Sequence, residues 1–575
     1  MLDRRKVVFY QPYCFDGFPR MPLPLMAVAR MVDREQFDPV IIDANLERDA
    51  LDRLLRVAAE QPVLVGMSVM PGDQVPKAFE ASRLLKARFP GLPIIWGGYF
   101  PSLYPESCLE TGVVDVLVKG YGEQTFSELL AHYAAGRSSA DLADIAGTLY
   151  KRDGKIIAER KRPLQDLNRY PALPYDLVDV PRYVAPTWHA KRSVFYVSSQ
   201  GCPYGCGFCA IPAVGGRKWT AYSPERVVGD ALFFAAEHGV DGVTFGDTEF
   251  FVSEERVRGI AEGLIAAGSP ITWWAMGTIA RLVEYQESTW RLMEQSRCVG
   301  IFVGAESGSD ETLKVMGKPS TVADTIRLAE IFNRHKILPE FSFVLGYPPH
   351  PEKDVAASLE LIRRLRDMNR TTHFIPHVYT PLPDTGNYEL ATHNRFAAPT
   401  TLEGWLRPGW MDFGRMHHPS TPWLEGEQGR FLHDFERFID YSNRVWANRA
   451  PGTVGPIASR LLKAACVLRW NANFFRYPYE LQLIWKAGRA VARLLEGEIP
   501  IPGPRPPWKR WRWRPKSQTK AGRERPLRPS RGDRHQEALD ENQRGQHGAT
   551  ADDGRSRQAP RGREDVVSGQ GAAIG

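Results

Sequence analysis

Short apolar runs alternate with longer segments of helical periodicity along the first 135 residues. The runs are rich in Val, Ile and Leu, which predicts buried strands at residues 6–10, 39–43, 63–69, 93–96 and 113–118. Between and after them, apolar positions recur every three or four residues, which predicts helices at 23–32, 50–60, 75–89 and 124–135. Strands joined by helical crossovers predict a parallel, doubly wound, Rossmann-like sheet. Ligands of such sheets bind beyond the carboxyl ends of the strands.

A second alternation of the same kind begins at residue 193. It predicts six strands, at residues 193–198, 242–245, 271–275, 300–304, 340–345 and 372–379. The helical segments that accompany them fall at 224–237, 254–267, 287–295, 322–335 and 352–367. Six βα repeats predict a second α/β unit, with functional residues at the carboxyl ends of its strands.

The remaining segments set the domain boundaries. A hairpin with an Asp-Gly turn is predicted at 148–158, and a proline-punctuated connector follows at 170–176. Helices are predicted at 431–448, 457–473 and 480–495, and polar, glycine-rich sequence after them predicts disorder. We therefore expect an N-terminal domain (1–145), a hairpin and linker (146–190), a second α/β domain (191–385), a helical extension (386–514) and a disordered tail (515–575).

Composition narrows the class of protein. A hydrophobic content of 43% over 575 residues is ordinary for a soluble chain with sizeable cores. The sequence contains no run of about 18 apolar residues, so it predicts no membrane-spanning helix. Much of the net charge of +7 comes from the Arg-rich tail, so the charge says little about the α/β domains. Seven Cys, three of them clustered, together with the absence of a signal-peptide pattern, favour a reducing, cytoplasmic compartment.

The three clustered cysteines carry the strongest chemical signal. Cys202, Cys206 and Cys209 have the spacing C-x3-C-x2-C, in a glycine-rich loop directly after the strand predicted at 193–198. Cuboidal iron–sulfur clusters usually take four thiolates, so three leave one iron open to bind a substrate or cofactor. A structural zinc site is the first alternative, but the nearest histidines, His189 and His238, are poorly placed as a fourth ligand. A disulfide framework is less favoured still in a long chain of this kind.

This spacing, with Phe208 before the last cysteine and a strand before the loop, resembles the signature of the radical S-adenosylmethionine (SAM) enzymes. The resemblance implies an open (β/α)6 barrel in which the three cysteines bind a [4Fe-4S] cluster. It further implies that SAM chelates the open iron and is cleaved to a 5′-deoxyadenosyl radical.

The resemblance also places SAM contacts at the ends of three strands. Gly246 and Asp247 follow the second strand, where the family contacts the SAM amino group. Glu306 and Ser307 lie in a match to the family's G-x-E-S-G segment, and Gly346 lies in its glycine–proline turn near adenine. Carboxylates suit an ammonium group or ribose hydroxyls because they accept charge-assisted hydrogen bonds. For Asp247 and Glu306 the structural alternative is capping of the following helix.

The order of the two α/β units resembles that of class B radical SAM proteins, which carry a cobalamin-binding domain first. The residues that this resemblance assigns to cobalamin follow three of the predicted N-terminal strands; they are Ser68, Gly97, Gly98, Gly120 and Glu123. The D-x-H-x-x-G loop that supplies a cobalt ligand in other cobalamin proteins is missing after the first strand, at residues 12–17. Cobalamin would therefore bind without a His from that motif. Glycines at turns are also used for geometry alone.

The resemblance implies a function and partners. We expect radical methyl transfer to an unactivated carbon of a small-molecule or lipid substrate, with electrons from a donor such as flavodoxin or ferredoxin. Radical oxidation, cyclisation or rearrangement is the second possibility, and a non-catalytic redox or cobalamin sensor is the third. Beyond residue 400, Trp405, Trp410, Met411, His417, His418 and Trp423 form an aromatic, His-containing stretch.

The helical extension ends in Trp508-Lys-Arg-Trp-Arg-Trp-Arg514. Basic residues interleaved with Trp suit peripheral contact with the inner face of a membrane. Nucleic-acid binding, which uses the same chemistry, is less favoured. A helical cap with a basic tail and no ligand is equally compatible with the pattern.

Overall fold

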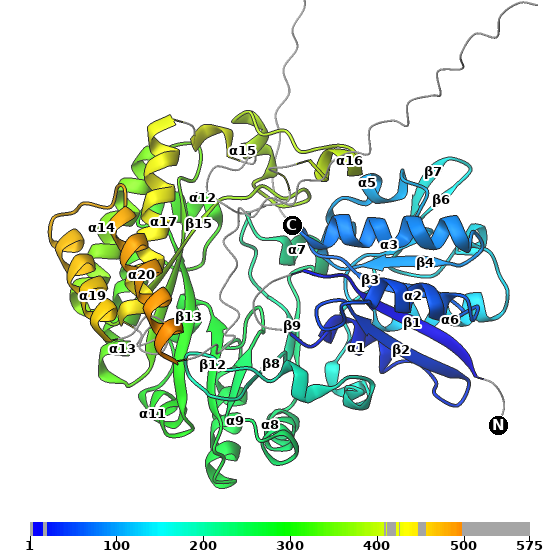
Figure 1. Cartoon of the computed structure of the whole chain (residues 1–575), viewed down its shortest axis with the longest axis horizontal. Helices are drawn as coiled ribbons and strands as arrows, with labels where there is room; N and C mark the ends of the chain where they lie inside the picture. Colours follow the sequence, from blue (N-terminus) through cyan, green and yellow to red (C-terminus); the bar gives the residue numbers. More distant parts are fainter. Residues whose placement is uncertain are drawn as a thin grey trace, which may run out of the picture. The chain divides into compact units, whose positions relative to one another are not determined.

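The computed structural model describes residues 4–14, 20–407, 410, 421–424, 426–446 and 456–496. The chain forms two units, Met1–Pro507 and Trp508–Gly575, and every described residue belongs to the first unit (Figure 1). The predicted disordered tail and the Trp/Arg-rich segment 508–514 lie outside the described residues, as do Met411, His417 and His418.

The N-terminal sheet has the strand order β2-β1-β3-β4-β5-β6-β7. Its first five strands are parallel, as predicted; they are β1 (Arg5–Gln11), β2 (Phe37–Asp43), β3 (Val65–Ser68), β4 (Ile94–Gly97) and β5 (Val116–Val118). The predicted hairpin, β6 (Thr148–Arg152) and β7 (Lys155–Ala158), adds two antiparallel strands to this sheet. The hairpin, which we had placed with the linker, thus continues the first sheet.

Alternate residues of β1 enter two different cores, as a doubly wound sheet requires. Val7 and Phe9 pack in the core that includes Met26 and Phe126, from α1 (Leu23–Ala29) and α6 (Glu123–Ala134). The intervening residues pack in the core on the other face, formed with α2 (Ala50–Ala58) and α3 (Gln74–Arg88). Because the side chains of a strand alternate between faces, burial on both sides explains the continuous apolar runs of the sequence.

The second sheet is parallel throughout, with the order β15-β14-β13-β12-β11-β8. Its strands are β8 (Ser193–Tyr196), β11 (Gly242–Phe245), β12 (Thr272–Gly277), β13 (Cys298–Glu306), β14 (Leu338–Leu345) and β15 (His373–Val378). The helices between them are α8 (Pro224–His238), α9 (Glu254–Ala266), α11 (Glu287–Gln295), α13 (Val322–Arg334) and α14 (Pro351–Met368). Within the described residues β8 and β15 form the two edges, which confirms six parallel strands in an open sheet; that this sheet curves into a partial barrel stays a prediction.

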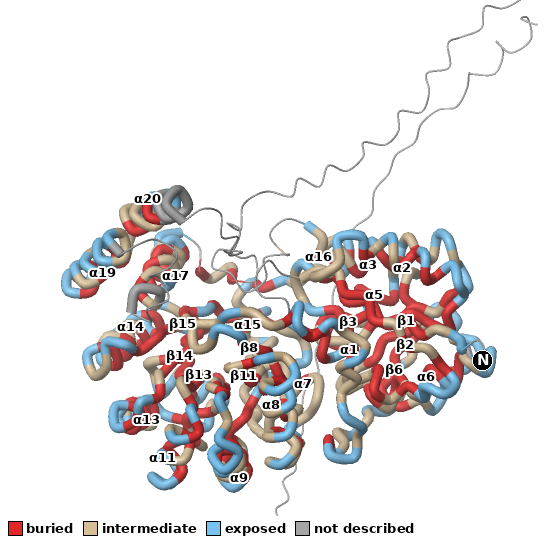
Figure 2. The backbone as a smooth tube through the Cα atoms, turned by 60° about the horizontal axis from the view of Figure 1, so that its bottom comes forward, coloured by how far each residue is buried: buried red, intermediate tan, exposed pale blue. Residues whose placement is uncertain are grey.

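Three long helices follow the second sheet: α17 (Gly426–Trp446), α19 (Pro456–Asn471) and α20 (Tyr479–Glu496). Figure 2 shows buried strands in both sheets, whereas exposed residues alternate with buried ones along α19 and α20. Of the aromatic stretch predicted after residue 400, Trp405 packs edge-on against Trp410, and Trp423 donates a hydrogen bond to the carbonyl of Gly346. Among the described helices, none combines the length and the apolar character needed to cross a bilayer.

Candidate functional site

The cysteine loop is fixed by contacts with two distant segments. It leaves a small hairpin of β9 (Ser199–Gly201) and β10 (Trp219–Ala221) and runs into α7 (Ala210–Gly215), a helix absent from our prediction. The N–H of Gly207 donates to the carbonyl of Met316 at 2.8 Å, and the carbonyl of Gly207 accepts from the N–H of Asn387 at 2.8 Å. A Cβ atom on Gly207 would lie 2.3 Å from Oδ1 of Asn387. Glycine at this position is therefore a packing requirement.

The three thiols of this loop fit a cluster. Cys202, Cys206 and Cys209 are partly exposed and interact electrostatically with one another. Burial raises the pKa of Cys209 to about 11 and that of Cys202 to about 12, so a metal must stabilise their thiolates at neutral pH. Within the described part of the chain, no three His, Cys, Asp or Glu are arranged to hold a single metal ion. A cuboidal cluster instead takes each thiolate on a different iron.

Phe208, between the last two cysteines of the loop, packs in a small apolar cluster. Its neighbours there include Met316 of α12 (Asp310–Met316) and Tyr347, which follows β14. This aromatic ring therefore ties the loop to the ends of the neighbouring strands.

A buried ion pair stands beside the loop, at the end of β13. Nζ of Lys318 lies 3.1 Å from Oε1 of Glu306, and both side chains are at most one-tenth exposed. Burial lowers the pKa of Lys318, but the Glu306 carboxylate and the Cys206 thiol outweigh it, so the pKa is raised and the amine stays charged. Burial raises the pKa of both Cys206 and Cys209, and the Lys318 cation opposes this rise.

Glu306 itself has an unusual backbone. Its φ is 63°, and the pairing of β13 with β14 shifts register between Gly304 and Glu306. A left-handed conformation costs a residue other than Gly of order 1–3 kcal/mol, and such residues cluster at functional sites. A Cβ on Gly304 would lie 2.0 Å from Oε1 of Glu306, so Gly304 makes room for this carboxylate.

Two carboxylates follow β11, and the structure gives them different surroundings. Asp247 is fully buried and accepts hydrogen bonds from the N–H of Ser198 at 3.0 Å, from the hydroxyl of Ser198 at 2.7 Å and from the hydroxyl of Ser199. These bonds hold the turn that leads to the cysteine loop. Gly246, the residue before it, packs under Phe195, whose ring a Cβ would meet at 1.9 Å.

Glu249 was not singled out in the sequence, although it stands two residues after Asp247. It is 1% exposed, accepts a hydrogen bond from the hydroxyl of Thr278 and acts electrostatically on Cys202 and Cys206. Burial raises the pKa of its carboxyl to about 7. A second carboxylate in the same turn was the available signal, but the sequence does not reveal which of the two faces the loop.

A further residue missed in the sequence is Asp354, which ties two strand ends together. Its Oδ1 accepts a hydrogen bond from the hydroxyl of Ser307, and its Oδ2 accepts from the N–H groups of Gly346 and Tyr347 at 2.9 and 3.0 Å. Ser307 and Gly346, two predicted SAM contacts, are thus brought together through Asp354. His377 of β15 is exposed and lies within electrostatic range of Glu306.

The predicted cobalamin residues stand at or just after the carboxyl ends of β3, β4 and β5. Ser68 and Gly97 end β3 and β4. Gly98 has a φ of 99°, and a Cβ there would lie 2.7 Å from the carbonyl oxygen of Val69. Gly120 has a φ of 88°. Two of these four residues therefore need the conformational freedom of glycine, which explains them without a ligand.

The loops after β4 and β5 approach the cysteine loop. A Cβ on Gly120 would lie 3.6 Å from the carbonyl oxygen of Val214 in α7, and the phenol of Tyr99 lies within electrostatic range of Cys209. A Cβ on Gly215 would lie 3.0 Å from the Tyr121 ring. The loops at the carboxyl ends of β4 and β5 therefore lie close to the segment that carries the three cysteines.

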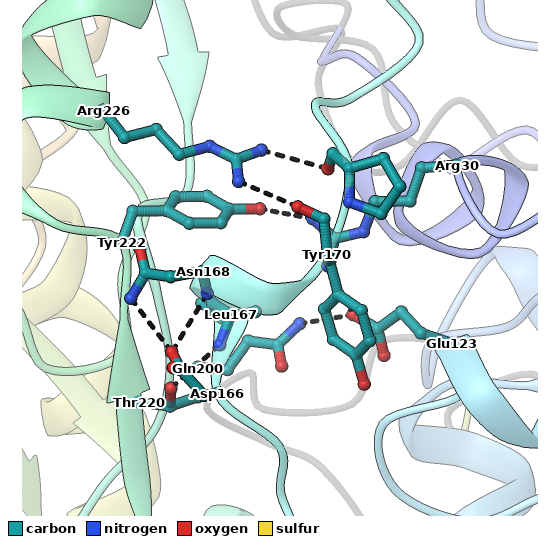
Figure 3. Close-up of polar contacts among 11 residues, drawn as sticks. Arg30, Glu123, Asp166, Leu167, Asn168, Tyr170, Gln200, Thr220, Tyr222 and Arg226 are labelled. Atoms are coloured by element: carbon teal, nitrogen blue, oxygen red, sulfur yellow. Dashed lines mark hydrogen bonds and ion pairs between the residues drawn. The ribbon is translucent and has the colours of Figure 1, made fainter.

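Glu123 joins the two domains (Figure 3). Its Oε1 lies 3.1 Å from Nη2 of Arg30 and accepts a hydrogen bond from Nε2 of Gln200 at 2.8 Å. Arg30 also donates to the hydroxyl of Tyr222 at 2.6 Å and lies over the ring of Tyr170 at 4.6 Å. Glu123 is 2% exposed, so its carboxylate is engaged within the protein, and its partner Gln200 stands two residues before Cys202.

Comparison with known proteins gives two matched regions. The model of the radical SAM superfamily matches residues 196–362, and that of the B12 binding domain matches residues 17–130. An uncharacterised methyltransferase of Pyrococcus horikoshii is 28% identical, over 65% of this chain and 79% of that protein. The anaerobic magnesium-protoporphyrin IX monomethyl ester cyclase of Synechocystis is 25% identical, over 65% of this chain and 73% of that protein.

Solved structures share the fold. The radical SAM methyltransferase TsrM from Kitasatospora setae, with cobalamin and a [4Fe-4S] cluster bound, superposes with a TM-score of 0.58 and 18% identity. That match covers 81% of this chain and all of the TsrM chain. The cobalamin-dependent radical enzyme OxsB, with aqua-cobalamin and SAM bound, gives a TM-score of 0.59 at 15% identity, over 82% of this chain and 72% of that one.

Proposed function

Because this chain belongs to the cobalamin-binding class of radical SAM enzymes, we propose that it transfers a methyl group from SAM to an unactivated carbon of a small molecule. The enzyme uses a [4Fe-4S] cluster, SAM and cobalamin, which when bound supply a carbon-centred radical and a transferable methyl group. Such chemistry suits sp³ C–H bonds, which are too weakly acidic for a general base.

One observation supports transfer between two cofactors in a shared site. The loop after β5 approaches α7, which directly follows the cysteine loop: a Cβ on Gly215 would lie 3.0 Å from the Tyr121 ring, and one on Gly120 would lie 3.6 Å from the carbonyl oxygen of Val214. A ligand at the edge of the first sheet and a cluster on the cysteine loop would therefore be neighbours. The Pyrococcus relative and TsrM are both named methyltransferases, which favours the same outcome here.

The chain's own residues have distinct parts in this proposal. Cys202, Cys206 and Cys209 hold the cluster. Lys318 keeps a positive charge beside the thiols and fixes the Glu306 carboxylate, which would accept hydrogen bonds from SAM. Asp247 positions the cysteine loop by accepting hydrogen bonds from Ser198 and Ser199, and we propose this role for it instead of a direct contact with SAM.

The cobalamin contacts that we propose are the backbone groups of Gly97, Gly98 and Gly120 and the hydroxyl of Ser68. Glu123 acts instead by positioning, since Arg30 and Gln200 occupy its carboxylate. The loop after β1, where the cobalt-ligating His motif is missing, lies outside the described residues from 15 to 19.

A second outcome, radical cyclisation without methyl transfer, is favoured by one observation. The Synechocystis relative, which is similar over the same share of this chain, is named a cyclase. The sensor hypothesis is not retained, because membership of this enzyme family makes the chain an enzyme.

The experiment that separates the two outcomes follows the methyl group of SAM. The reconstituted protein, supplied with cobalamin and reduced by flavodoxin or ferredoxin, is incubated in extract with SAM labelled in its methyl group. We expect 5′-deoxyadenosine together with a product that carries the label. A product without the label, formed with 5′-deoxyadenosine, would show that the reaction is oxidation or cyclisation and not methyl transfer.

A lipid substrate, a cytoplasmic location and membrane contact through residues 508–514 remain part of the proposal.

A further inference from the structure

Exposed large apolar side chains gather in one part of the described chain. Seven of the eleven lie between residues 457 and 483, and the other four are single residues in separate elements. The seven, which we call the hairpin surface, are Ile457, Leu461, Leu468, Phe474, Tyr477, Tyr479 and Leu483. Scattered apolar residues need no explanation, but a gathered set marks an interaction site.

Helix α19 is apolar on two sides. Leu462 and Cys466 are fully buried in the core that α19 shares with α17. Ile457, Leu461 and Leu468 are spaced by four and seven residues, so they share another side of the helix, where they are between 54% and 73% exposed. The side with Leu462 and Cys466 packs the helix against the protein, whereas the side with Leu461 and Leu468 is exposed.

Helix α20 repeats this arrangement. Leu481 is fully buried, whereas Tyr479 and Leu483, four residues apart, are 54% and 67% exposed. Phe474 and Tyr477 extend the surface across the turn between the two helices, at 49% and 53% exposed. Figure 2 shows exposed stretches on both helices.

The charge of the two helices indicates the partner. Residues 456–496 contain seven Lys or Arg and two Glu, a net charge of +5. Glu480 is engaged by the buried Arg469, which bonds to both of its oxygens. The exposed cations on these helices include Arg460, Lys463 and Lys486. Apolar and aromatic side chains flanked by Lys and Arg are typical of helices that lie in a bilayer interface.

We propose that the hairpin surface docks on an anionic phospholipid bilayer, with α19 and α20 lying in the plane of the interface. Its apolar side chains would enter the boundary between headgroups and acyl chains, and the cations would contact lipid phosphates. This surface is separate from residues 508–514, and the proposal does not depend on the reaction catalysed.

Charge disfavours the other occupants. A two-fold contact between copies of this chain would place the same patch against itself, +5 against +5. Residues 497–575 carry seventeen Lys or Arg against ten Asp or Glu, so the chain's own tail has the same sign of charge. An anionic surface is the complement that remains.

Vesicle co-sedimentation of the full-length protein tests this proposal. We expect pelleting with vesicles of phosphatidylcholine and phosphatidylglycerol, weaker pelleting at high salt, and little with phosphatidylcholine alone. The triple variant Leu461→Ser, Leu468→Ser and Leu483→Ser should lower the partition coefficient about tenfold or more, because apolar burial is lost at three positions. Ile265→Ser, which removes an exposed apolar residue from α9, is the matched control and should bind as the parent does.

A second variant tests the charge separately. Arg460→Glu with Lys486→Glu should weaken binding to the anionic vesicles and leave the melting temperature unchanged. The proposal fails if the parent protein does not pellet, or if the triple variant pellets as well as the parent, which would place the contact elsewhere, including residues 508–514. It also fails if size-exclusion chromatography shows a dimer that the triple variant converts to a monomer, since the surface would then pair two copies.

Discussion

At the scale of the residue, the ion pair Lys318–Glu306 is the feature of the site that sequence reasoning foresaw only in part. Glu306 was found through its motif, but neither its left-handed backbone nor its partner could be predicted. Lys318 lies twelve residues later in the chain and meets Glu306 only because α12 folds back on the strand end. The role of Asp247 was ambiguous for a similar reason: a motif gives a position but not the direction of a side chain.

Replacing Lys318 by Met should make the cluster harder to reduce. The variant removes a buried positive charge beside Cys206 and leaves all three thiols in place, so iron content should be retained. An added electron is less stable without that charge, and the reduction potential should become more negative. Potentiometric titration followed by electron paramagnetic resonance measures it. Lys314→Met, at an exposed position of α12, is the control, and an equal shift in both variants would refute the role of Lys318.

Glu249 should make stability depend on pH. Burial raises its pKa from 4.5 to about 7, so the folded protein holds this proton more tightly than the unfolded chain. The carboxyl therefore favours folding below about pH 4.5, and this contribution is lost as the pH rises through about 7. Compared with the parent apoprotein, Glu249→Gln should gain stability at pH 8 relative to pH 5, in urea unfolding of both proteins. A difference that is the same at both pH values would show that this carboxyl does not titrate as described.

At the scale of the element, the strands and crossover helices were predicted because buried parallel strands and amphipathic helices leave strong periodic signals. The hairpin β6–β7 was found, but its attachment to the first sheet was not, since edge pairing depends on contacts distant in sequence. Short helix α7 left no periodic signal. Asp384, which follows β15, adopts a φ of 60°, a backbone conformation that the strand and helix periodicity does not predict.

Gly207→Ala should damage the cysteine loop. The added methyl group would lie 2.3 Å from Oδ1 of Asn387, and the backbone bonds to Met316 and Asn387 leave the loop little room to shift. We expect less iron bound per chain after reconstitution. Gly229→Ala is the control, because a Cβ there meets nothing within 4 Å and Ala in a helix stabilises by about 1 kcal/mol. Full iron loading of Gly207→Ala would show that the loop tolerates the side chain.

At the scale of the whole molecule, the junction around Arg30 and Glu123 couples the two domains. The sequence predicted both domains and their order but not this contact, because its members are dispersed between residues 30 and 222. Glu123 was expected to contact cobalamin, and its burial between Arg30 and Gln200 shows what a motif alone cannot: which partner occupies a carboxylate.

Arg30→Met should destabilise the protein by about 3–5 kcal/mol, because it leaves the Glu123 carboxylate buried without its cation. Arg34→Met is the matched control. Arg34 pairs with Asp176 at 2.7 Å, but both side chains are about half exposed or more, so the loss should be about 0–1 kcal/mol. Urea unfolding measures the loss in the free energy of unfolding for each variant. Equal losses in the two variants would contradict a coupling role for Arg30.

The central claim, a radical SAM enzyme whose cluster rests on Cys202, Cys206 and Cys209, is tested most directly by 5′-deoxyadenosine formation in two cysteine variants. After anaerobic reconstitution and reduction with SAM present, the parent protein should release 5′-deoxyadenosine. Cys206→Ala should release none, because it lacks a cluster ligand, and Cys298→Ala, which changes a buried cysteine of β13, should retain the activity. Release by Cys206→Ala together with loss in Cys298→Ala would contradict the assignment.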